Sequence, residues 1–305
     1  MSIIVTGASG AFGRKATAVL MEKVSPSELI LVTRNPDSMA EAKARGATIR
    51  YGDFDEPESL KAAFAGGERM LLISTMNVGR RPKQHGNAID AAKAAGVRYL
   101  VYTSSDGLHP DNPAIIAPDH RATEALIKAS GLDYTIMRDS LYGETPVTMV
   151  APEALKTGFW RSPSGKGKVG FSAKKDCSAC AATVLAGEGH EGITYAITGP
   201  EALTFRDACD LASETTGKHI EYVDISFEEF DKDLQALGIP EDYINNMNID
   251  GKTSGRRDII SYERGVFLGY FSNVSGDVKK ILGREPTSLR ETYQEHRDFL
   301  MQFVK

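Results

Sequence analysis

The chain has 305 residues, of which 41% are hydrophobic and 25% charged, and this balance excludes wholesale disorder. Its formal net charge of −5 does not favour nucleic-acid binding, and its basic stretches are too short to act as basic arms. No apolar run is long enough to cross a membrane, the N-terminus does not resemble a signal peptide, and three cysteines are typical of a reducing compartment. We therefore expect a cytoplasmic globular protein of about two domains, without nucleic-acid or membrane partners.

Short apolar strands alternate with helical patterns over the first half of the chain. The expected strands are 2–6, 29–33, 48–51, 70–74, 99–103 and 133–138. The expected helices are 12–23, 36–45, 56–64, 84–95 and 119–129. Continuous apolar strands separated by helices indicate a parallel sheet that is covered on both faces. The pattern predicts an α/β, Rossmann-type doubly wound domain over residues 1–140.

The regular alternation of strands and helices ends after about Ser140, where helical patterns dominate. They cover 146–156, 176–186, 205–216, 227–237, 274–282 and 289–303, with short strands such as 193–197 between them. This predicts a smaller, mostly helical domain over residues 141–305, from which some strands return to the main sheet. Residues 245–271 have weak periodicity and several glycines, which predicts a mobile loop or lid.

A glycine-rich loop follows the first strand and begins the first helix. Gly7 would make a tight turn, Gly10 would let the backbone approach a phosphate, and Gly13 would let the helix pack closely on the strand. The helix N-terminus adds free N–H groups that suit a pyrophosphate. This context favours a dinucleotide site over a purely structural glycine turn. The residues expected to contact the cofactor here are Gly7, Ala8, Ser9, Gly10, Ala11, Phe12 and Gly13.

The end of the second strand selects the cofactor. An acidic residue about 20 positions after the glycines would bind the ribose hydroxyl of NAD. Arg34 stands there instead, 21 residues after Gly13. A guanidinium suits a 2′-phosphate in charge and geometry. We therefore predict NADPH rather than NADH, with a solvated surface arginine as the alternative.

Further cofactor contacts are expected where the next strands end, because ligands of open α/β sheets bind outside the carboxyl ends of the strands. Asp53 and Phe54 are candidates for the adenine, although they could equally cap the following helix. Gln84 could reach the ribose from the start of its helix. The remaining candidates are Ser74, Thr75, Met76, Thr103 and Ser104.

These residues together resemble the NmrA-like, atypical short-chain dehydrogenase/reductase family over nearly the whole chain. The likeness is greatest to the bacterial NADPH-dependent quinone oxidoreductases, followed by the triphenylmethane dye reductases. It implies a cleft between the two domains for a flat aromatic electrophile, and a segment with Leu141 and Tyr142 that lines both the nicotinamide of the cofactor and the substrate. The matching stretches are 6–13, 32–36, 52–60, 87–102, 130–138 and 189–192.

One departure from the wider superfamily concerns the acid–base pair. Most short-chain dehydrogenases carry Tyr-x-x-x-Lys, whereas His120 and Glu124 occupy those places here. This disfavours ordinary carbonyl reduction. His120 titrates in a suitable range and is a candidate proton shuttle with Ser105, although it could instead bond locally at the helix start. Further polar candidates nearby are Ser104, Asp106 and His109.

Aromatic residues of the second half are candidates for the substrate site. Tyr142 could form a wall of the cleft, and Trp160 and Phe171 could roof it, although all three could be core residues. Cys177 and Cys180 form a C-x-x-C inside a helical pattern, where neither zinc nor redox chemistry is expected. We predict no metal site.

The sequence thus predicts an NADPH-dependent oxidoreductase that reduces a quinone or related aromatic acceptor. Reduction of a benzylic ether, a lignan or a dye is the alternative within enzymes. A non-catalytic regulator that senses NADP(H) is the alternative outside them. The oligomeric state, monomer or homodimer, stays open.

Overall fold

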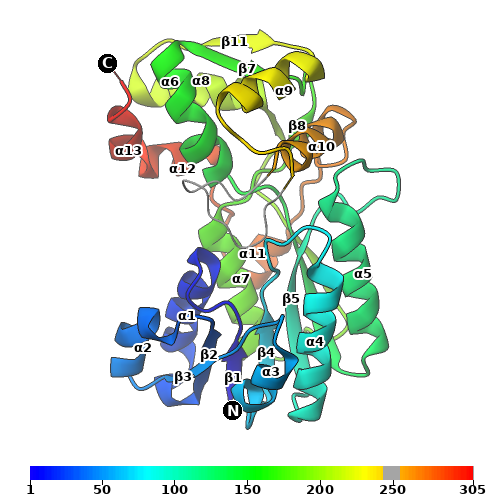
Figure 1. The fold of residues 1–305 in the computed structure, drawn as a ribbon. Coiled ribbons are helices and arrows are strands. Elements are labelled where there is room, and N and C mark those ends of the chain that lie inside the picture. Colours follow the sequence, from blue (N-terminus) through cyan, green and yellow to red (C-terminus); the bar gives the residue numbers. More distant parts are fainter. Residues whose placement is uncertain (243–254, 305) are drawn as a thin grey trace.

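The computed structural model describes residues 1–242 and 255–304, and its lower half is built on a seven-stranded parallel sheet (Figure 1). The strand order is β3-β2-β1-β4-β5-β6-β9, so the direction of winding reverses between β1 and β4. The strands are β1 (Ile3–Val5), β2 (Leu29–Thr33), β3 (Thr48–Tyr51), β4 (Arg69–Leu72), β5 (Tyr99–Ser105), β6 (Asp133–Asp139) and β9 (Thr194–Ile197). The predicted Rossmann-type sheet and the late return of a strand to it are confirmed.

Helices cover both faces of this sheet because side chains alternate along each strand. Ile3 and Val5 face one apolar cluster, and Ile4 faces the other. The first cluster lies under α1 (Ala11–Lys23), α2 (Ala40–Ala44), α7 (Lys174–Ala186) and α11 (Asp277–Leu282). The second lies under α3 (Pro57–Phe64), α4 (Arg81–Ala94) and α5 (Ile116–Ala129). Two short 3₁₀ turns, η1 (Pro26–Glu28) and η2 (Pro36–Met39), flank β2.

The upper half has its own apolar core and is mostly helical (Figure 1). Its helices are η3 (Pro146–Val150), α6 (Ala151–Thr157), α8 (Phe205–Thr216), α9 (Phe227–Ala236), α10 (Arg256–Phe267), α12 (Leu289–Glu295) and α13 (Arg297–Met301). Two short strand pairs complete it, β7 (Phe159–Ser162) with β11 (Glu221–Asp224) and β8 (Lys168–Val169) with β10 (Leu203–Thr204). The chain first leaves the sheet after β6, and α7, β9 and α11 then return to the lower half.

The expected loop over residues 245–271 is corrected in its second part, where α10 begins at Arg256. Residues 243–254 lie outside the described part of the chain. The sequence does not predict this helix because few of its residues are apolar and buried. It also contains Gly265, a residue that disfavours helices, at the point where α10 contacts the loop that contains Asn112. A Cβ at Gly265 would lie 2.5 Å from Asn112 Oδ1, so only glycine lets α10 approach this loop.

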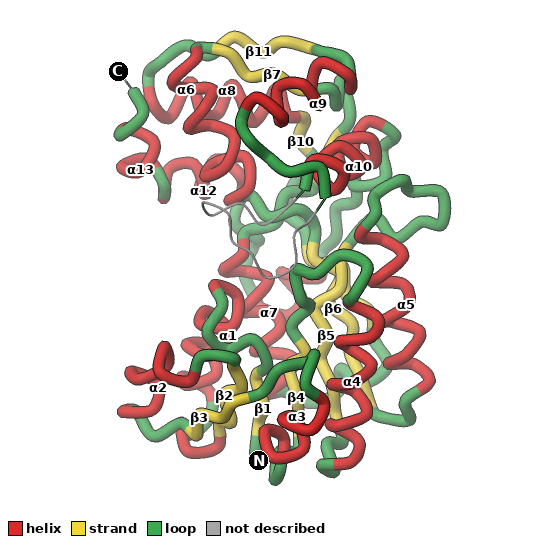
Figure 2. The backbone as a smooth tube through the Cα atoms, viewed as in Figure 1, coloured by secondary structure: helices red, strands yellow, loops and turns green. Residues whose placement is uncertain are grey.

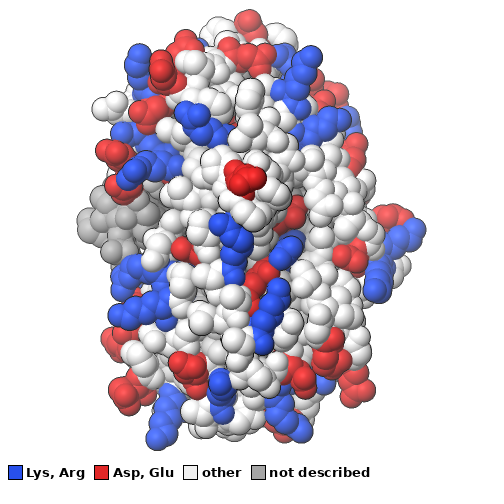
Figure 3. Space-filling view, turned by 90° about the vertical axis from the view of Figure 1, so that its right-hand side faces the viewer, with Lys and Arg blue, Asp and Glu red and all other residues white. Residues whose placement is uncertain are grey.

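Loops gather where the carboxyl ends of the strands face the upper half (Figure 2). In the described residues, no helix is both long and apolar enough to cross a membrane. Acidic and basic side chains are interspersed on the face shown in Figure 3.

Candidate cofactor and substrate site

The loop between β1 and α1 forms a cradle of backbone. Gly7 has a φ of +58° and its carbonyl accepts a hydrogen bond from Gly10 N–H at 3.0 Å. A Cβ on Gly13 would lie 2.4 Å from Gly7 O and 2.7 Å from Ala8 Cα. Gly10 is the N-cap of α1 and offers no side-chain acceptor to the first-turn N–H groups. The geometry fits a dinucleotide, since these amides can receive a pyrophosphate at the positive end of the helix dipole.

Hydrogen bonds to neighbouring strands hold this loop in place. Thr6 Oγ1 donates to Leu71 O and accepts from Ile73 N–H, both at 3.0 Å. The hydroxyls of Ser9 and Thr33 are 2.7 Å apart, which ties the loop to the end of β2. The cradle is therefore supported from both sides of the switch point.

Two arginines lie near the end of β2 in different roles, Arg34 directly after the strand and Arg14 in the first turn of α1. Arg34 is exposed there, where the sequence analysis predicts the 2′-phosphate contact. Arg14, which the sequence analysis did not single out, donates from Nε to Ser9 O at 2.9 Å and from Nη2 to Ser38 O at 2.8 Å. It thereby fastens the glycine loop to the segment that follows β2. Its position directly after the last glycine is the only sequence signal for this role.

Asp53 and Phe54 follow β3 and are both half-buried. Asp53 Oδ1 accepts the N–H of Asp55 at 2.9 Å, so its carboxylate stabilises the turn before α3. The Phe54 ring lies edge-on to the His85 imidazole, with 6.3 Å between ring centroids. Both residues thus have a local structural role, and the contact with an adenine stays a prediction.

Gln84 is buried in the first turn of α4. Its Oε1 accepts from Thr75 Oγ1 at 2.7 Å and from Asn77 Nδ2 at 3.3 Å. Its Nε2 donates to Asp55 Oδ2 at 2.9 Å. The amide and the Thr75 hydroxyl therefore fix the β4–α4 loop, and their contact with a cofactor stays a prediction.

The other residues at the ends of β4 and β5 differ in exposure. Met76 is 53% exposed at the rim, and Ser74 is half-buried. Thr103 Oγ1 accepts the N–H of Ser74 at 2.9 Å, so it fixes the backbone rather than offering a free hydroxyl. Ser74 and Met76 stay candidates for contact with a cofactor.

A buried polar network lies behind this loop and includes two histidines. Thr75 N–H donates to His85 Nε2 at 3.1 Å, so the neutral ring carries its proton on Nδ1 and donates it to Thr123 Oγ1 at 2.9 Å. Burial and the nearby Arg81 charge lower the pKa of His85 to about 3. His120 Nδ1 bonds Tyr102 OH at 2.8 Å.

His120 is not suited to the role expected of it. It is buried, and burial, with the charge of Arg81, lowers the pKa of its imidazole well below the usual value. The ring is therefore neutral at neutral pH and carries no acidic proton to shuttle. The alternative reading, a residue that bonds locally near the start of its helix, agrees better with the bond to Tyr102.

Glu124 and Ser104 are engaged in an ion pair that joins β5, β6 and α5. Arg138 binds Glu124 with Nε to Oε1 at 2.9 Å and Nη2 to Oε2 at 2.7 Å. Ser104 Oγ donates to Glu124 Oε1 at 2.8 Å. Ser105 is half-buried at the end of β5 and donates to Asp106 O at 3.0 Å. The Glu124 carboxylate thus fixes the strand ends, while Ser105 and the Arg138 side chain are partly exposed.

Two acidic residues, Asp106 and Asp139, meet at the ends of β5 and β6. Asp106 N–H donates to Asp139 O at 2.9 Å. Tyr142 OH donates to Asp139 Oδ2 at 3.1 Å. Asp139 Oδ1 and Asp106 Oδ2 are buried and have no hydrogen-bond partner among the described residues. Burial raises the pKa of the Asp139 carboxyl to about 7 and also raises that of Asp106.

The sequence predicts Asp106 only as a polar helper, and Asp139 is not among the predicted site residues. An acidic residue at the end of an apolar strand was the available signal. Its burial could not be read from the sequence because α7, 35 or more residues later in the chain, supplies part of the cover.

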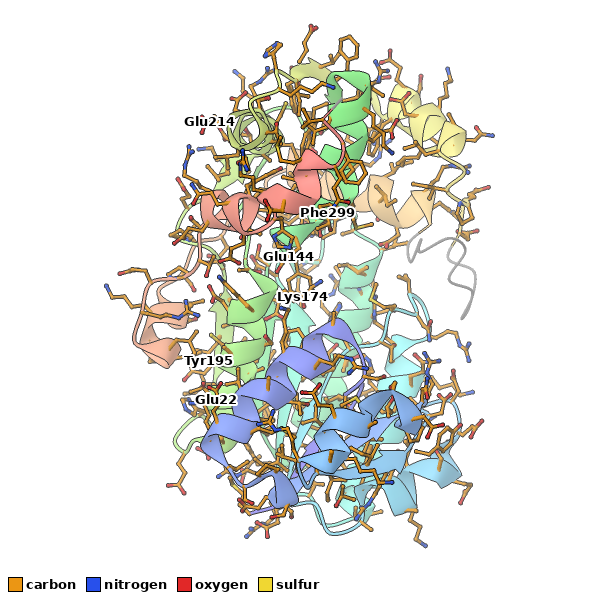
Figure 4. All side chains as sticks on the ribbon, turned by 90° about the vertical axis from the view of Figure 1, so that its left-hand side faces the viewer. Glu22, Glu144, Lys174, Tyr195, Glu214 and Phe299 are labelled. Carbon is orange, nitrogen blue, oxygen red and sulfur yellow. The ribbon has the colours of Figure 1, made fainter. Side chains whose placement is uncertain are left out.

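Tyr142 lies where the two halves meet. Lys174 Nζ lies 4.9 Å from the centre of its ring, and the Glu144 carboxylate accepts the N–H of Lys174 at the start of α7. Figure 4 shows Glu144 and Lys174 at this junction. Leu141 is half-buried against the upper core. Tyr142 and Leu141 thus occupy the junction at which the sequence predicts a substrate.

Trp160 and Phe171 do not roof the junction. They are 1% and 2% exposed inside the apolar core of the upper half, where Phe171 packs edge-on against Phe205. Their predicted contact with substrate is corrected to a structural role. Cys177 and Cys180 are free, buried thiols on α7, and burial raises the pKa of both.

Comparison with known proteins agrees with this geometry. The family model described as NAD(P)H-binding matches residues 7–161. Quinone oxidoreductase 2 of Escherichia coli is 34% identical over 291 residues, covering 95% of this chain and 96% of the relative.

Two solved structures are also similar. The NADPH-dependent quinone oxidoreductase of Escherichia coli in complex with NADPH has a TM-score of 0.87 at 32% identity, covering 96% of this chain and 99% of that one. The Citrobacter sp. triphenylmethane reductase in complex with NADP(H) has a TM-score of 0.86 at 30% identity, covering 97% and 99%. The resemblance inferred from the sequence is confirmed.

Proposed function

Because the chain belongs to the NAD(P)H-binding family, we propose that it is an oxidoreductase that transfers hydride from NADPH to a quinone or a related aromatic electrophile. The observation that carries the proposal is the backbone cradle of Gly7, Gly10 and Gly13 at the switch point of the sheet. The cofactor, when bound, supplies the hydride. The protein's own task is to bind the cofactor, orient it toward the acceptor and exclude water.

The residues that would hold NADPH are distributed along the carboxyl edge of the sheet. The cradle would receive the pyrophosphate through the first-turn amides of α1. Arg34 would pair with the 2′-phosphate, and Arg14 would keep the two loops in register. Leu141 and Tyr142 would lie at the nicotinamide end, which faces the junction with the upper half.

A strong hydride acceptor suits this site better than an ordinary ketone. His120 and Glu124, which stand where the usual acid–base pair would, are buried and committed to Tyr102 and Arg138. A quinone or a cationic dye accepts hydride readily because its product is conjugated, so positioning supplies much of the catalysis. The likeness to a triphenylmethane reductase supports a cationic dye as the second candidate acceptor.

The test is the enzyme-dependent loss of NADPH absorbance with a simple quinone, with NADH as the paired control. We expect rapid loss with NADPH and little with NADH. If the protein binds NADPH but neither a quinone nor a cationic dye oxidises the bound cofactor, the result would contradict the proposal and favour a cofactor sensor. We place the protein in the cytoplasm, since its three cysteines are free and buried.

A further inference from the structure

The carboxyl end of β6 holds an acidic side chain whose surroundings do not match those of an ordinary surface carboxylate. Asp139 is 6% exposed, and its Oδ1 has no hydrogen-bond partner among the described residues. Its Oδ2 accepts the Tyr142 hydroxyl, and the neutral Cys177 thiol beside the carboxyl is a second donor that lowers its pKa against the effect of burial. No arginine or lysine forms an ion pair with it in the described part of the chain. A carboxylate in such a place is costly unless it carries a proton or gains a partner.

The titratable groups around Asp139 do not supply a positive charge to it. Tyr142 faces it from the segment after β6, Cys177 and Cys180 face it from α7, and Asp106 adjoins it after β5. Cys177 Sγ donates to Ser172 Oγ at 3.3 Å, and Glu144 acts on Tyr142 and Cys177 as a further negative charge. The charge of Lys174 lies over the face of the Tyr142 ring rather than beside the carboxyl.

Arg138, the neighbour of Asp139 in the chain, points to the opposite face of the sheet. Successive side chains of a strand alternate between faces, and the Arg138 guanidinium is paired there with Glu124 on α5. The geometry of the strand therefore separates Asp139 from this guanidinium, whose charge acts on Asp106 and lowers the pKa of that carboxyl against the effect of burial.

We propose that Asp139 is the proton source for the acceptor, with the proton held on Oδ1 and Tyr142 bonded to Oδ2. This inference rests on the proposed function. A quinone that has accepted hydride is a hydroquinone anion and lacks one proton. The O–H bond of Asp139 breaks, a phenolic O–H bond forms, and the resulting carboxylate regains a proton from solvent. Tyr142 stabilises that carboxylate through its donated hydrogen bond.

The other acids of the site fit this role less well. His120 is neutral at neutral pH, and burial raises the pKa of Tyr142 and Cys177 well above their usual values, so both hold their protons. The pKa of Asp139, about 7, suits a group that must release a proton and regain it near neutral pH. It also lies at the edge of the sheet where ligands of open α/β folds bind.

Two acceptors separate proton delivery from hydride delivery. A quinone needs hydride and a proton, whereas a cationic triphenylmethane dye needs hydride alone to become the neutral leuco form. We expect Asp139→Asn to lower kcat with a quinone on the order of 100-fold, the usual range for a positioned general acid. The same variant should lower dye reduction far less. Asp133→Asn, an exposed acid at the start of the same strand, is the matched control and should change neither rate.

The unliganded protein gives an independent readout. In wild type, infrared difference spectra between about pH 6 and about pH 8 should contain a protonated-carboxyl carbonyl band that is weaker in Asp139→Asn, with the remainder coming from Glu263, whose pKa burial also raises to about 7. Tyr142→Phe should move the loss of that band to higher pH, because it removes a hydrogen bond that favours the carboxylate. NADPH binding, followed by fluorescence, should be retained in Asp139→Asn.

The outcomes distinguish this inference from the proposed function. If neither acceptor oxidises NADPH in wild type, the proposed function fails. If both acceptors are reduced by wild type and Asp139→Asn slows them equally, or slows neither, the proton role is overturned while the function stands. An unchanged infrared band in the variant would likewise overturn it.

Discussion

The two ends of the candidate site are made in different ways. At the β1–α1 end the contacts offered to a ligand are backbone amides, and glycines shape them. At the β5–β6 end the offered groups are side chains, with Asp139 and Tyr142 at the end of β6 and Lys174 added by the return of α7. A backbone site tolerates almost no added atom, whereas a side-chain site is sensitive to protonation. The predictions below test this difference.

The largest expected effect is at the backbone end. Gly13→Val places a Cβ about 2.4 Å from a carbonyl oxygen and adds two methyl groups beyond it, so the loop and α1 have to move apart. We expect NADPH binding, measured by fluorescence titration, to be lost and the protein to be destabilised by a few kcal/mol, on the scale of overpacked sites.

The control is a glycine that meets no such obstacle. A Cβ at Gly86 in α4 would contact only Leu126 Cδ1, at 3.8 Å. Gly86→Ala should keep NADPH binding and raise the free energy of unfolding by up to about 1 kcal/mol, because alanine favours the helix. Retained binding in Gly13→Val would contradict the view that the cradle has no room.

This contrast explains how much of the molecule could be predicted from the sequence. The glycine loop, Arg34 and the parallel sheet follow from local signals, because each lies within one strand–loop–helix unit. The local bonds of Gln84 and His120 could not be predicted because their partners, Asp55 and Tyr102, come from other segments. Trp160 and Phe171 were misplaced since an aromatic residue has the same sequence signature in a core as in a cleft. The burial of Asp139 depends on α7, which no local pattern connects to β6.

The second prediction concerns the side-chain end and the stability of the unliganded protein. The pKa of Asp139 is about 7 in the folded state against an ordinary value of 3.8. Between these values the folded protein holds a proton that the unfolded chain has lost, so stability falls as the pH rises from about 4 to about 7 and does not recover above it. Asp139→Asn removes this loss of stability. The variant's advantage over wild type in free energy of unfolding should therefore be larger at pH 8 than at pH 4, by on the order of a few kcal/mol.

The measurement is the difference in free energy of unfolding between wild type and Asp139→Asn, obtained from urea unfolding at each pH. Some slope should remain in the variant because burial also raises the pKa of Glu263, in the upper half, to about 7. Asp133→Asn should keep the wild-type slope. Parallel curves for wild type and Asp139→Asn would show that Asp139 titrates normally.

The third prediction returns to the cofactor end but concerns a side chain. Arg34→Asp replaces a cation with an anion at the predicted position of the 2′-phosphate, and it should weaken NADPH on the order of 10- to 100-fold, the scale of one lost charge-assisted bond. NADH, which lacks that phosphate, should be affected little. Arg45→Asp, an exposed arginine near the end of α2, controls for long-range charge. Equal losses for NADPH and NADH in Arg34→Asp would exclude the 2′-phosphate assignment.

The smallest expected effect lies away from both ends. Ser226 caps α9 in the upper half, accepting the N–H of Glu229 at 3.2 Å while the Glu229 carboxylate accepts the N–H of Ser226 at 2.9 Å. Ser226→Ala removes half of this capping box and should cost about 1 kcal/mol of unfolding free energy. NADPH binding should be unchanged, since α9 packs on α10 in the upper half and the cradle lies in the lower half. A loss of NADPH affinity in this variant would mean that the two halves are coupled through the junction at Tyr142, and the two ends of the site could then no longer be treated as separate.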